Sequence, residues 1–369
     1  MKNSYLYILI MIVLLSCSRE NQSDEYPDSD ISFAVKELTT KVGDTTIIPI
    51  LSKLENSKFT IKINNTAIVK IIQKNSKFIS LLAKYEGKIK ISLYDQSNTI
   101  KDTCLINIGK KNTIKLLCLG NSFSEDAVEN YLYELCKSNQ QDLLIGNLVL
   151  AGASFTHHID NLNNNLPVYS YRKISLDGKR VTLSNQTIQN TLKDEKWDII
   201  SFQQVSQNSG QYETFKQNLP LLYQLVIKNN PNPNTKYILH QTWAYGKNSS
   251  HPGFANYNKN QLEMYHAIVS TYQASYSLIP TYFIVPCGTS IQNGRTSAYL
   301  DNDLTRDGYH LSLGVGRFIA ACTWYEKITN SSVMDNKFSP SSLTYNEVIS
   351  CKKAAHNAVI KPYEITPID

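Results

Sequence analysis

The spacing of apolar and polar residues changes three times along the chain. Residues 6–15 are almost continuously apolar, and a polar, acidic stretch without apolar periodicity follows at 18–30. From about Ile31 to Ile108, short alternating segments are separated by polar turns, which is typical of β-strands. From Lys110 onward, continuous apolar segments alternate with stretches of helical periodicity. The pattern predicts an N-terminal export signal, an all-β domain and an α/β domain.

The all-β domain is predicted over residues 31–110. Its strands are expected at 45–50, 59–63, 67–72, 78–82, 88–93 and 104–108. Repeated short strands argue for a small β-sandwich. The segment has no cluster of His, Cys or carboxylate side chains, so we expect a spacer. A weak glycan-binding role stays open.

The α/β domain is predicted over residues 111–369, with five parallel strands. The strands are expected at 114–119, 143–150, 197–202, 237–240 and 282–285, in a sheet covered on both faces. Ligands of such sheets bind beyond the carboxyl ends of the strands. Each strand is followed there by a polar or glycine cluster: 120–122, 151–154, 203–207, 241–244 and 287–289. A β-hairpin around Asp177-Gly178 is also predicted. It either borders the pocket and selects substrate, or has no role in the site.

The first residues predict export as a lipoprotein. Lys2 supplies a positive start, and the apolar segment after it is short for a membrane span. Leu14-Leu15-Ser16-Cys17 resembles the lipobox of bacterial lipoproteins. Residues 1–16 would then be the signal peptide, Cys17 the lipid-bearing terminus and residues 17–30 a flexible tether. No Asp follows Cys17, so the resemblance implies the outer membrane. An ordinary signal peptide or a single membrane span is the alternative.

Composition and charge narrow the classes of partner. The formal net charge is +6, but Lys and Arg are scattered, and no basic segment interleaves with aromatic residues as a nucleic-acid surface requires. The cysteines after Cys17 lie mostly in apolar segments, which predicts small buried thiols. No CxxC or HExxH spacing occurs, so we expect neither a metal site nor a cofactor.

Two distant segments carry the candidate chemistry. Ser122 stands on a turn between a strand and a helix, where backbone amides can stabilise an oxyanion. Asp307 and His310 share one loop near the other end of the chain. A serine needs a base to accept its proton, and an imidazole needs a carboxylate to fix its tautomer, so the three residues predict nucleophilic catalysis. The alternatives are a serine that caps a helix and a solvated Asp-Gly turn.

These segments resemble the blocks of the SGNH/GDSL hydrolase superfamily. Gly120-Asn121-Ser122 matches the first block, with Asn121 where Asp is usual, Gly152 matches the second, and Asp307-Gly308-Tyr309-His310 matches the last. The resemblance implies a flavodoxin-like three-layer α/β/α domain with a five-stranded parallel sheet. It also implies that Ser122 is the nucleophile, His310 the base and Asp307 its orienting partner.

The stretch from about Ile114 to Cys322 is similar to one bacterial lipoprotein branch, the domain of unknown function 4886. The shared motifs are 120–124, 201–206, 240–244, 291–295 and 306–310. The all-β segment before it resembles the bacterial immunoglobulin-like modules that precede catalytic domains in surface proteins.

The third superfamily block is absent, and the sequence offers glutamines in its place. The usual Gly-x-Asn-Asp turn supplies an oxyanion-hole Asn; here Gln204 is the first candidate and Gln207 the next, because an amide donates the same bond. Capping of strand-end backbone groups is the alternative. The amides of Ser122 and Gly152 would complete the hole.

Three other residues are candidates for substrate contact. Trp243 is a candidate sugar-stacking ring, with ordinary packing as the alternative. His157 and Asn121 are candidates at the edge of the substrate.

The expected function is that of a lipid-anchored serine esterase at the outer membrane. It would remove acyl groups, most plausibly O-acetyl groups, from an extracellular polysaccharide or oligosaccharide without a cofactor. A non-catalytic glycan-binding surface lipoprotein on a hydrolase scaffold is the rival from another class. A hydrolase of lipid or thioester acyl groups is a third candidate, disfavoured because the sequence lacks a long apolar lid segment.

Overall fold

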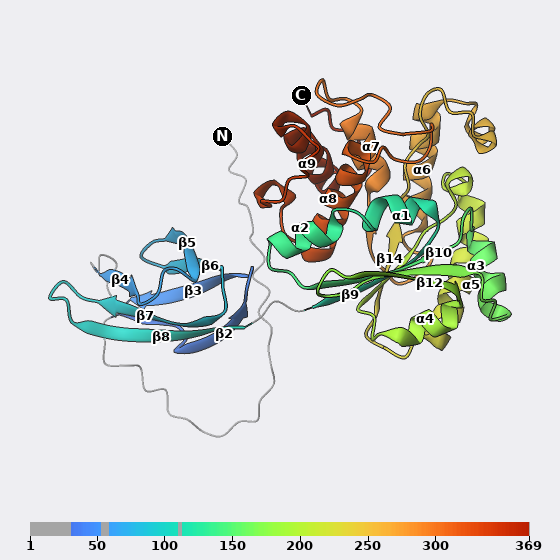
Figure 1. The fold of residues 1–369 in the computed structure, drawn as a ribbon. Coiled ribbons are helices and arrows are strands. Elements are labelled where there is room, and N and C mark those ends of the chain that lie inside the picture. Colours follow the sequence, from blue (N-terminus) through green and yellow to red (C-terminus); the bar gives the residue numbers. More distant parts are fainter. Residues whose placement is uncertain (1–30, 53–58, 110–112, 369) are drawn as a thin grey trace, which may run out of the picture. The chain divides into compact units, whose positions relative to one another are not determined.

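The computed structural model describes residues 31–52, 59–109 and 113–368, which form two compact units. The first unit holds most of the described residues up to Ile108, and the second holds Lys41–Asp44, Lys84–Glu86 and the described residues from Gly109 onward (Figure 1). The predicted signal peptide, the lipidated Cys17 and the tether lie outside the described residues. Across the described ranges, no helix combines the length and the apolar character that crossing a bilayer requires.

The first unit contains two four-stranded sheets. One has the order β1-β3-β6-β5, and the other β2-β8-β7-β4. The strands are β1 (Ile31–Phe33), β2 (Glu37–Lys41), β3 (Thr45–Ser52), β4 (Thr60–Ile63), β5 (Val69–Lys74), β6 (Phe78–Ala83), β7 (Gly87–Tyr94) and β8 (Ile100–Gly109). Alternation decides which side chains are buried, as in β3, where Ile48 and Ile50 are buried but Ile47 and Leu51 are exposed. The six predicted strands are confirmed, and the short β1 and β2 are additional.

The sheet of the second unit has seven strands rather than the predicted five. Its order is β12-β11-β10-β9-β13-β14-β15, and five of the strands run parallel. These five are β9 (Ile114–Gly120), β10 (Leu143–Val149), β13 (Ile199–Phe202), β14 (Lys236–His240) and β15 (Thr281–Val285). The predicted hairpin forms the antiparallel strands β11 (Tyr169–Ile174) and β12 (Arg180–Gln186), which extend the sheet beyond β10. Pairing of this hairpin with the sheet was not among the predictions from the sequence.

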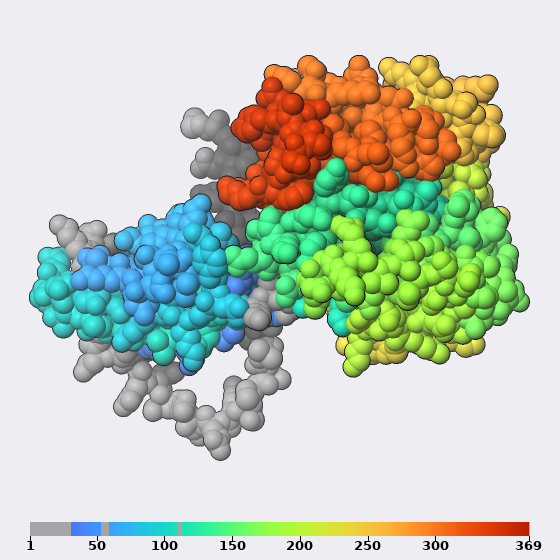
Figure 2. All heavy atoms as spheres, viewed as in Figure 1, coloured from blue at the N-terminus to red at the C-terminus, as the bar shows by residue number. Residues whose placement is uncertain are grey.

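Helices cover both faces of this sheet, so the unit has three layers (Figure 1). One face carries α1 (Ser122–Val128), α2 (Leu132–Ser138) and α8 (Val315–Thr329), with α7 (Cys287–Gly294) and α9 (Tyr345–Ile360) packed on α8. The other face carries α3 (Phe155–Asn163), α4 (Ile188–Asp194) and α5 (Tyr212–Asn229), and α6 (Gln261–Ser275) packs between α5 and α7. Figure 2 shows the C-terminal part of the chain, orange to red, lying over the teal segment of α1 and α2.

Strand β9 occupies the centre of the sheet because its side chains are apolar on both faces. Leu116, Leu117, Cys118 and Leu119 are all buried, as expected for a central strand between two helical layers. The prediction of buried thiols is also confirmed, since the described cysteines are all buried: Cys104, Cys118, Cys136, Cys287, Cys322 and Cys351. The carboxyl end of β9 leads directly into α1.

We expect Gly146→Ala to destabilise the second unit. Gly146 lies within β10, where a Cβ atom would stand 2.6 Å from Cη2 of Trp197 and 3.0 Å from Cε2 of Tyr171. Overpacking of this kind should lower the free energy of unfolding by about 1–3 kcal/mol. Denaturant unfolding measures the change, with Gly314→Ala as control, since a Cβ there would meet only Leu343 at 3.2 Å. An unchanged midpoint for Gly146→Ala would contradict the packing argument.

Candidate active site

The structure brings Ser122, Asp307 and His310 together at the carboxyl end of β9. Oγ of Ser122 lies 2.8 Å from Nε2 of His310, although the two residues are 188 positions apart. Nδ1 of His310 lies 2.6 Å from Oδ2 of Asp307. A hydroxyl, an imidazole and a carboxylate in this sequence of hydrogen bonds form an activated nucleophile with its base and the orienting partner of that base.

Asp307 fixes the loop and the tautomer of the imidazole. Its Oδ1 accepts the backbone N–H groups of His310 at 2.7 Å and Tyr309 at 3.2 Å. Partial burial opposes ionisation, but the hydrogen bonds from the side chain and backbone of His310 and from the backbone of Tyr309 lower the pKa of Asp307. The ionised carboxylate holds the proton of the neutral imidazole on Nδ1. Nε2 is therefore left to accept the proton of Ser122.

A buried carboxylate, Asp126, joins the helix of the nucleophile to the loop of the base. Its oxygens accept from Nη1 of Arg306 at 3.0 Å, from Nε of Arg317 at 2.8 Å and from the backbone N–H of Leu311 at 2.8 Å. Asp126 is 0% exposed, so these partners replace its hydration. Asp126 was not among the site residues predicted from the sequence. Asp126 lies four residues after Ser122 in the predicted helix, and this spacing places both on one helix face. The spacing was the one sign in the sequence that Asp126 lies near the site.

A group of aromatic rings packs against the imidazole of His310. The ring of Phe123 stacks on Trp243 with centroids 4.4 Å apart and lies 5.9 Å from the ring of His310. Nε1 of Trp243 donates to the carbonyl of Tyr309 at 2.8 Å. The prediction that Trp243 stacks on a sugar is wrong, because Trp243 is 0% exposed, its ring stacks on Phe123 and its N–H bonds to Tyr309.

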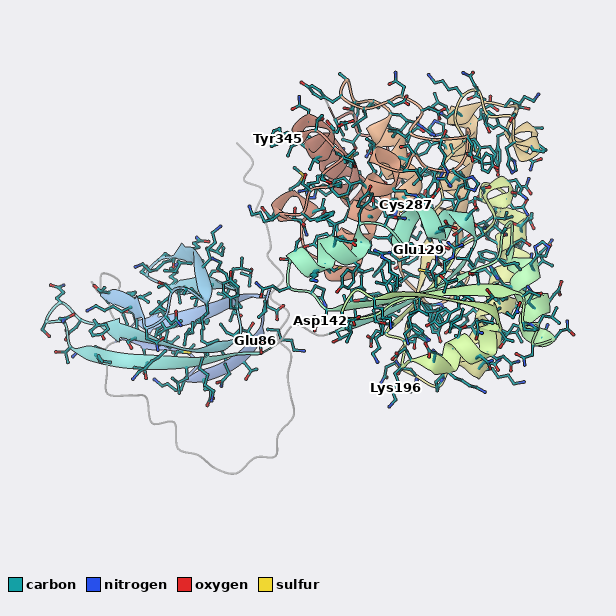
Figure 3. All side chains as sticks on the ribbon, viewed as in Figure 1. Glu86, Glu129, Asp142, Lys196, Cys287 and Tyr345 are labelled. Atoms are coloured by element: carbon teal, nitrogen blue, oxygen red, sulfur yellow. The ribbon has the colours of Figure 1, made fainter. Side chains whose placement is uncertain are left out.

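The sheet side of α1 is held by a second polar cluster. Oγ of Ser124 donates to Oδ1 of Asn147 on β10 at 2.8 Å, and Nδ2 of Asn147 donates to Glu129 at 2.6 Å. Glu129, labelled in Figure 3, also pairs with Arg172 on β11 at 3.2 Å. The helix that carries Ser122 is therefore fixed both to the sheet and to the loop that carries Asp307 and His310.

Two backbone donors beside Ser122 are available to a ligand. The N–H of Ser122 opens α1, so it has no carbonyl four residues earlier in the helix, and the N–H of Gly152 likewise has no hydrogen-bond partner among the described residues. Gly152 has φ +65° at the third position of the turn from Leu150 to Ala153, which glycine adopts without strain. A Cβ atom at Gly152 would meet nothing within 4 Å, so this turn faces open space.

The prediction that Gln204 is the first-choice oxyanion donor is wrong. Its Oε1 accepts the backbone N–H groups of Phe155 at 3.0 Å and Val205 at 2.9 Å, and its Nε2 donates to Thr214 at 3.1 Å. Gln204 is only 1% exposed, so it braces two loops from within the protein instead of facing the open turn at Gly152. The backbone-capping alternative describes its role.

Gln207 is the better-placed glutamine. It lies on the 3-10 helix η1 (Ser206–Asn208), directly after β13, and is half-buried. Its Oε1 accepts only a long bond of 3.5 Å from Ser206, and within the described part of the chain its Nε2 has no acceptor. The side-chain amide of Gln207 is therefore available to a ligand.

Asn121 is a structural residue, and the prediction that it contacts substrate is wrong. It is 1% exposed and caps α1, with Oδ1 accepting from the N–H of Phe123 at 3.0 Å and from Nε2 of Gln203 at 2.7 Å. Its Nδ2 donates to the carbonyl of Ala153 at 3.1 Å. Asn121 thus ties together the turns that follow β9, β10 and β13.

His157 is exposed at the edge of the same region. Its Nδ1 accepts the backbone N–H of Ser154 at 3.1 Å, which caps α3 just after the Gly152 turn. The exposed ring stays a candidate for substrate contact. The neighbouring His158 is buried and bonds to Tyr169 at 2.8 Å, so the two histidines form no joint site. Among the described residues, no group of three His, Cys, Asp or Glu side chains is arranged to hold a metal ion.

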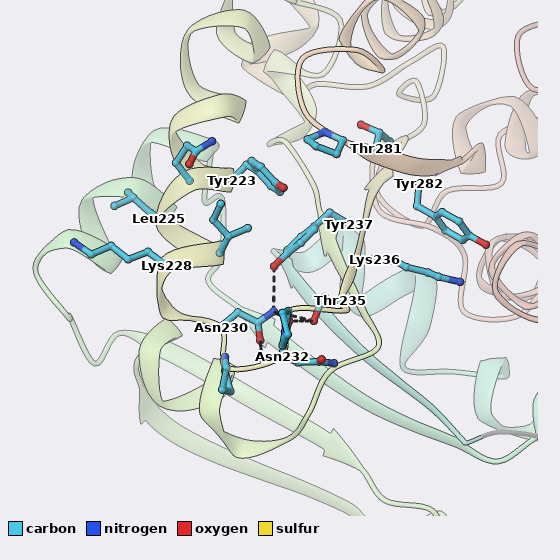
Figure 4. A pocket seen from close by; sticks show the side chains of 15 residues that line it. Tyr223, Leu225, Lys228, Asn230, Asn232, Thr235, Lys236, Tyr237, Thr281 and Tyr282 are labelled. Carbon is cyan, nitrogen blue, oxygen red and sulfur yellow. Dashed lines mark hydrogen bonds between the residues drawn. The ribbon is translucent and has the colours of Figure 1, made fainter. Parts of the chain in front are cut away.

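A cavity of about 1190 Å³ lies elsewhere, at the amino ends of β14 and β15 (Figure 4). Because the strands are parallel, this is the opposite end of the sheet from Ser122. Its polar groups bond to one another: Nδ2 of Asn230 donates to Tyr237 at 3.0 Å and to Thr235 at 2.8 Å. None of the described residues that line this cavity forms a hydrogen-bonded pair of nucleophile and base such as Ser122 and His310.

Comparisons with known proteins identify relatives of the second unit. The family described as Domain of unknown function (DUF4886) matches residues 115–358. The crystal structure of a DUF4886 family protein from Bacteroides uniformis is similar with a TM-score of 0.68 and 43% identity, over 70% of this chain and 98% of that one. An acetylxylan esterase from Geobacillus stearothermophilus has a TM-score of 0.36 at 12% identity, over 58% of this chain and 94% of its own. A GDSL-like lipase from Bacteroides thetaiotaomicron has a TM-score of 0.35 at 12% identity, over 58% of this chain and 88% of its own. No curated protein matches.

We expect Asp126→Asn to loosen the loop that carries Asp307 and His310. The variant leaves two arginines without their shared anion, which should lower the free energy of unfolding by about 3 kcal/mol. Glu125→Gln is the matched control on the same helix: that carboxylate is 31% exposed and pairs with Arg172, so its loss should cost less than about 1 kcal/mol. Denaturant unfolding compares the two variants. Equal midpoints for Asp126→Asn and Glu125→Gln would show that Asp126 does not hold the loop.

Proposed function

We propose that this chain, which belongs to the DUF4886 family, is a serine esterase of the SGNH hydrolase class with Ser122 as its nucleophile. The observation that carries the proposal is the uninterrupted series of hydrogen bonds from Asp307 through His310 to Ser122, at 2.6 and 2.8 Å. A protein that only binds glycans has no need of a serine hydroxyl in contact with an oriented imidazole.

The reaction follows from this geometry. Oγ of Ser122 attacks the ester carbonyl while Nε2 of His310 accepts its proton. The tetrahedral intermediate collapses as the imidazolium gives that proton to the departing alkoxide, which leaves as an alcohol. Water then attacks the acyl-serine, again with His310 as base, and the acid is released with Ser122 restored. Asp307 stabilises the imidazolium in both halves of the reaction.

Three donors are proposed for the oxyanion hole. The backbone N–H groups of Ser122 and Gly152 are unpaired within the described residues and belong to turns tied together by Asn121. The third donor is Nε2 of Gln207, which replaces the amide of the missing Asn. Each would strengthen its hydrogen bond as negative charge develops on the carbonyl oxygen.

The proposed substrate is an O-acetylated carbohydrate. The site is open, since the Gly152 turn and His157 are exposed and the side chain of Asp307 is 39% exposed. An open rim suits a polymer whose acyl groups project from a long backbone. The second support is the glutamine in place of the usual oxyanion-hole Asn, which resembles some carbohydrate-esterase branches of the superfamily.

The proposal also covers where the enzyme acts. The signal-like N-terminus and the lipobox at Cys17 support export and lipid attachment at the outer membrane. The all-β unit, which we propose is an immunoglobulin-like sandwich, would then act as a spacer between the anchor and the flavodoxin-like esterase domain.

Ser122→Ala tests the assignment. Acetate release from acetylated glycans and from an aryl acetate should fall by at least about 10³-fold, because the variant lacks the nucleophile, while the melting temperature should stay within a few degrees. A Ser122→Ala variant as active as wild type would contradict the proposed role of Ser122 as nucleophile. No release by folded wild-type protein, together with unchanged glycan binding by the variant, would favour the non-catalytic binder.

Gln207→Leu tests the third donor. We expect kcat to fall about a hundredfold with a small change in KM, since the donor acts mainly on the developing oxyanion. Gln224→Leu, at an exposed position on α5, is the matched control and should keep wild-type kinetics. Steady-state kinetics on one acetate ester measures both. A kcat within twofold of wild type for Gln207→Leu would remove this residue from the hole.

A further inference from the structure

The arrangement of Ser122, His310 and Asp307, here called the triad, determines on which side of the site the alcohol part of an ester must lie. In the proposed mechanism, on which this inference rests, Nε2 of His310 delivers a proton to the departing alkoxide. The alcohol part is therefore held next to the imidazole, whereas the carbonyl oxygen points toward the amides of Ser122 and Gly152. Residues that surround His310 are the candidates for contact with the alcohol.

The ring of Tyr309 is the accessible apolar surface beside the imidazole. Its centroid lies 4.2 Å from that of His310, and Tyr309 is half-buried. The other ring that touches His310 belongs to Phe123, which is 2% exposed and lies beneath. A bound alcohol that approaches His310 thus meets one face or edge of Tyr309.

A second histidine, His251, packs against Tyr309. The two ring centroids are 4.9 Å apart, and His251 also lies 4.8 Å from the buried ring of Tyr245. Nδ1 of His251 accepts the backbone N–H of Gly253 at 3.0 Å, so a neutral ring carries its proton on Nε2. Partial burial and the nearby His310 lower the pKa of His251, which keeps the ring neutral near pH 7. Within the described residues, Nε2 has no hydrogen-bond partner.

The segment that carries His251 is held against the catalytic loop. The N–H of Gly246 donates to the carbonyl of Gly308 at 2.7 Å, and the N–H of His251 donates to Oγ of Ser249 at 3.3 Å. A Cβ atom on Gly308 would come within 2.9 Å of Ser249, so the two segments are in close contact. His251 is therefore positioned before any substrate binds, which limits the entropy lost on binding.

We propose that Tyr309 and His251 form a binding site for the alcohol part of the substrate, and that the alcohol they accept is a sugar ring bearing the ester. A pyranose has an apolar C–H face, which packs on an aromatic ring, and hydroxyl groups beside the ester, which accept from a neutral N–H donor. His251 supplies that donor from Nε2, and Tyr309 supplies the ring. A simple alkyl alcohol has no hydroxyl with which to use His251.

Two acetate esters separate this role from a general effect on catalysis. An O-acetylated methyl xylopyranoside and ethyl acetate give the same acetyl-enzyme at Ser122, so their kcat/KM values differ only through the alcohol part. The measured quantity is the ratio of the two kcat/KM values, sugar ester over ethyl acetate. Wild type is measured beside Ser122→Ala to confirm that both hydrolyses depend on the serine.

Two variants of His251 separate the roles of its two ring nitrogens. His251→Asn keeps an acceptor near the position of Nδ1, which can still cap the turn, but has no donor at the position of Nε2. We expect it to lower the ratio about tenfold, the loss that follows removal of one hydrogen bond, mainly through KM of the sugar ester. His251→Gln places an amide donor near Nε2 and should keep the ratio within about threefold of wild type. His266→Asn, at an exposed histidine on α6, is the control.

The outcomes distinguish this inference from the proposed function. Ser122-dependent hydrolysis of both esters, with a wild-type ratio in His251→Asn, would remove the sugar site and leave the serine esterase standing. Equal losses on both esters would show that His251 acts on the triad and not on the sugar, which also overturns the inference. No hydrolysis of either ester by folded wild type would overturn both.

Discussion

The buried carboxylate of Asp126 is the interaction on which the site depends. Ser122 and Asp126 are one turn apart on α1, so whatever binds Asp126 is placed beside the nucleophile. The carboxylate binds Arg306, directly before Asp307, and the backbone of Leu311, directly after His310. Both ends of the catalytic loop are thus held to the helix of the serine. This contact removes much of the freedom of a loop that lies 180 or more residues away in the chain.

A second constraint acts beneath the loop, and it is apolar. Phe123 follows the nucleophile on the same helix, and its stacking on Trp243 supports the imidazole from below. Asn121, in turn, explains why an amide can replace the usual carboxylate of the first block. Its Nδ2 donates to the carbonyl of Ala153, a bond that an ionised Asp cannot donate. Because Asn121 is only 1% exposed, a neutral amide at this position also avoids the desolvation cost that a charged carboxylate would have. Asn121, which stands where the superfamily usually has Asp, therefore stabilises the turns. Its presence does not by itself argue against catalysis.

Much of this arrangement could be read from the sequence, because local patterns carry it. The apolar strands, the strand-to-helix turn at Ser122 and the Asp307/His310 spacing depend on residues close together in the chain. The mistaken roles of Gln204 and Trp243 have a common physical cause. Both follow the carboxyl end of a strand, where a side chain turns either toward the crevice or back into the protein, and only tertiary packing decides which. Asp126 was missed for a related reason: a carboxylate on a short helix looks solvated until its two arginines are brought in from the far end of the chain.

The two sides of the proposed site are built from different loops, and this has a consequence for specificity. The oxyanion side uses the turns after β9, β10 and β13, which Asn121, Gln203 and Gln204 brace from within. The alcohol side uses the segment after β14, which is bound to the catalytic loop through Gly308. Changes at His251 can therefore alter the alcohol that is accepted without disturbing the backbone donors of Ser122 and Gly152. Gln207 is the exception among the proposed donors, because it packs against Gly253 on the alcohol side. Changes in the braced turns affect every substrate alike, since each forms the same kind of tetrahedral intermediate.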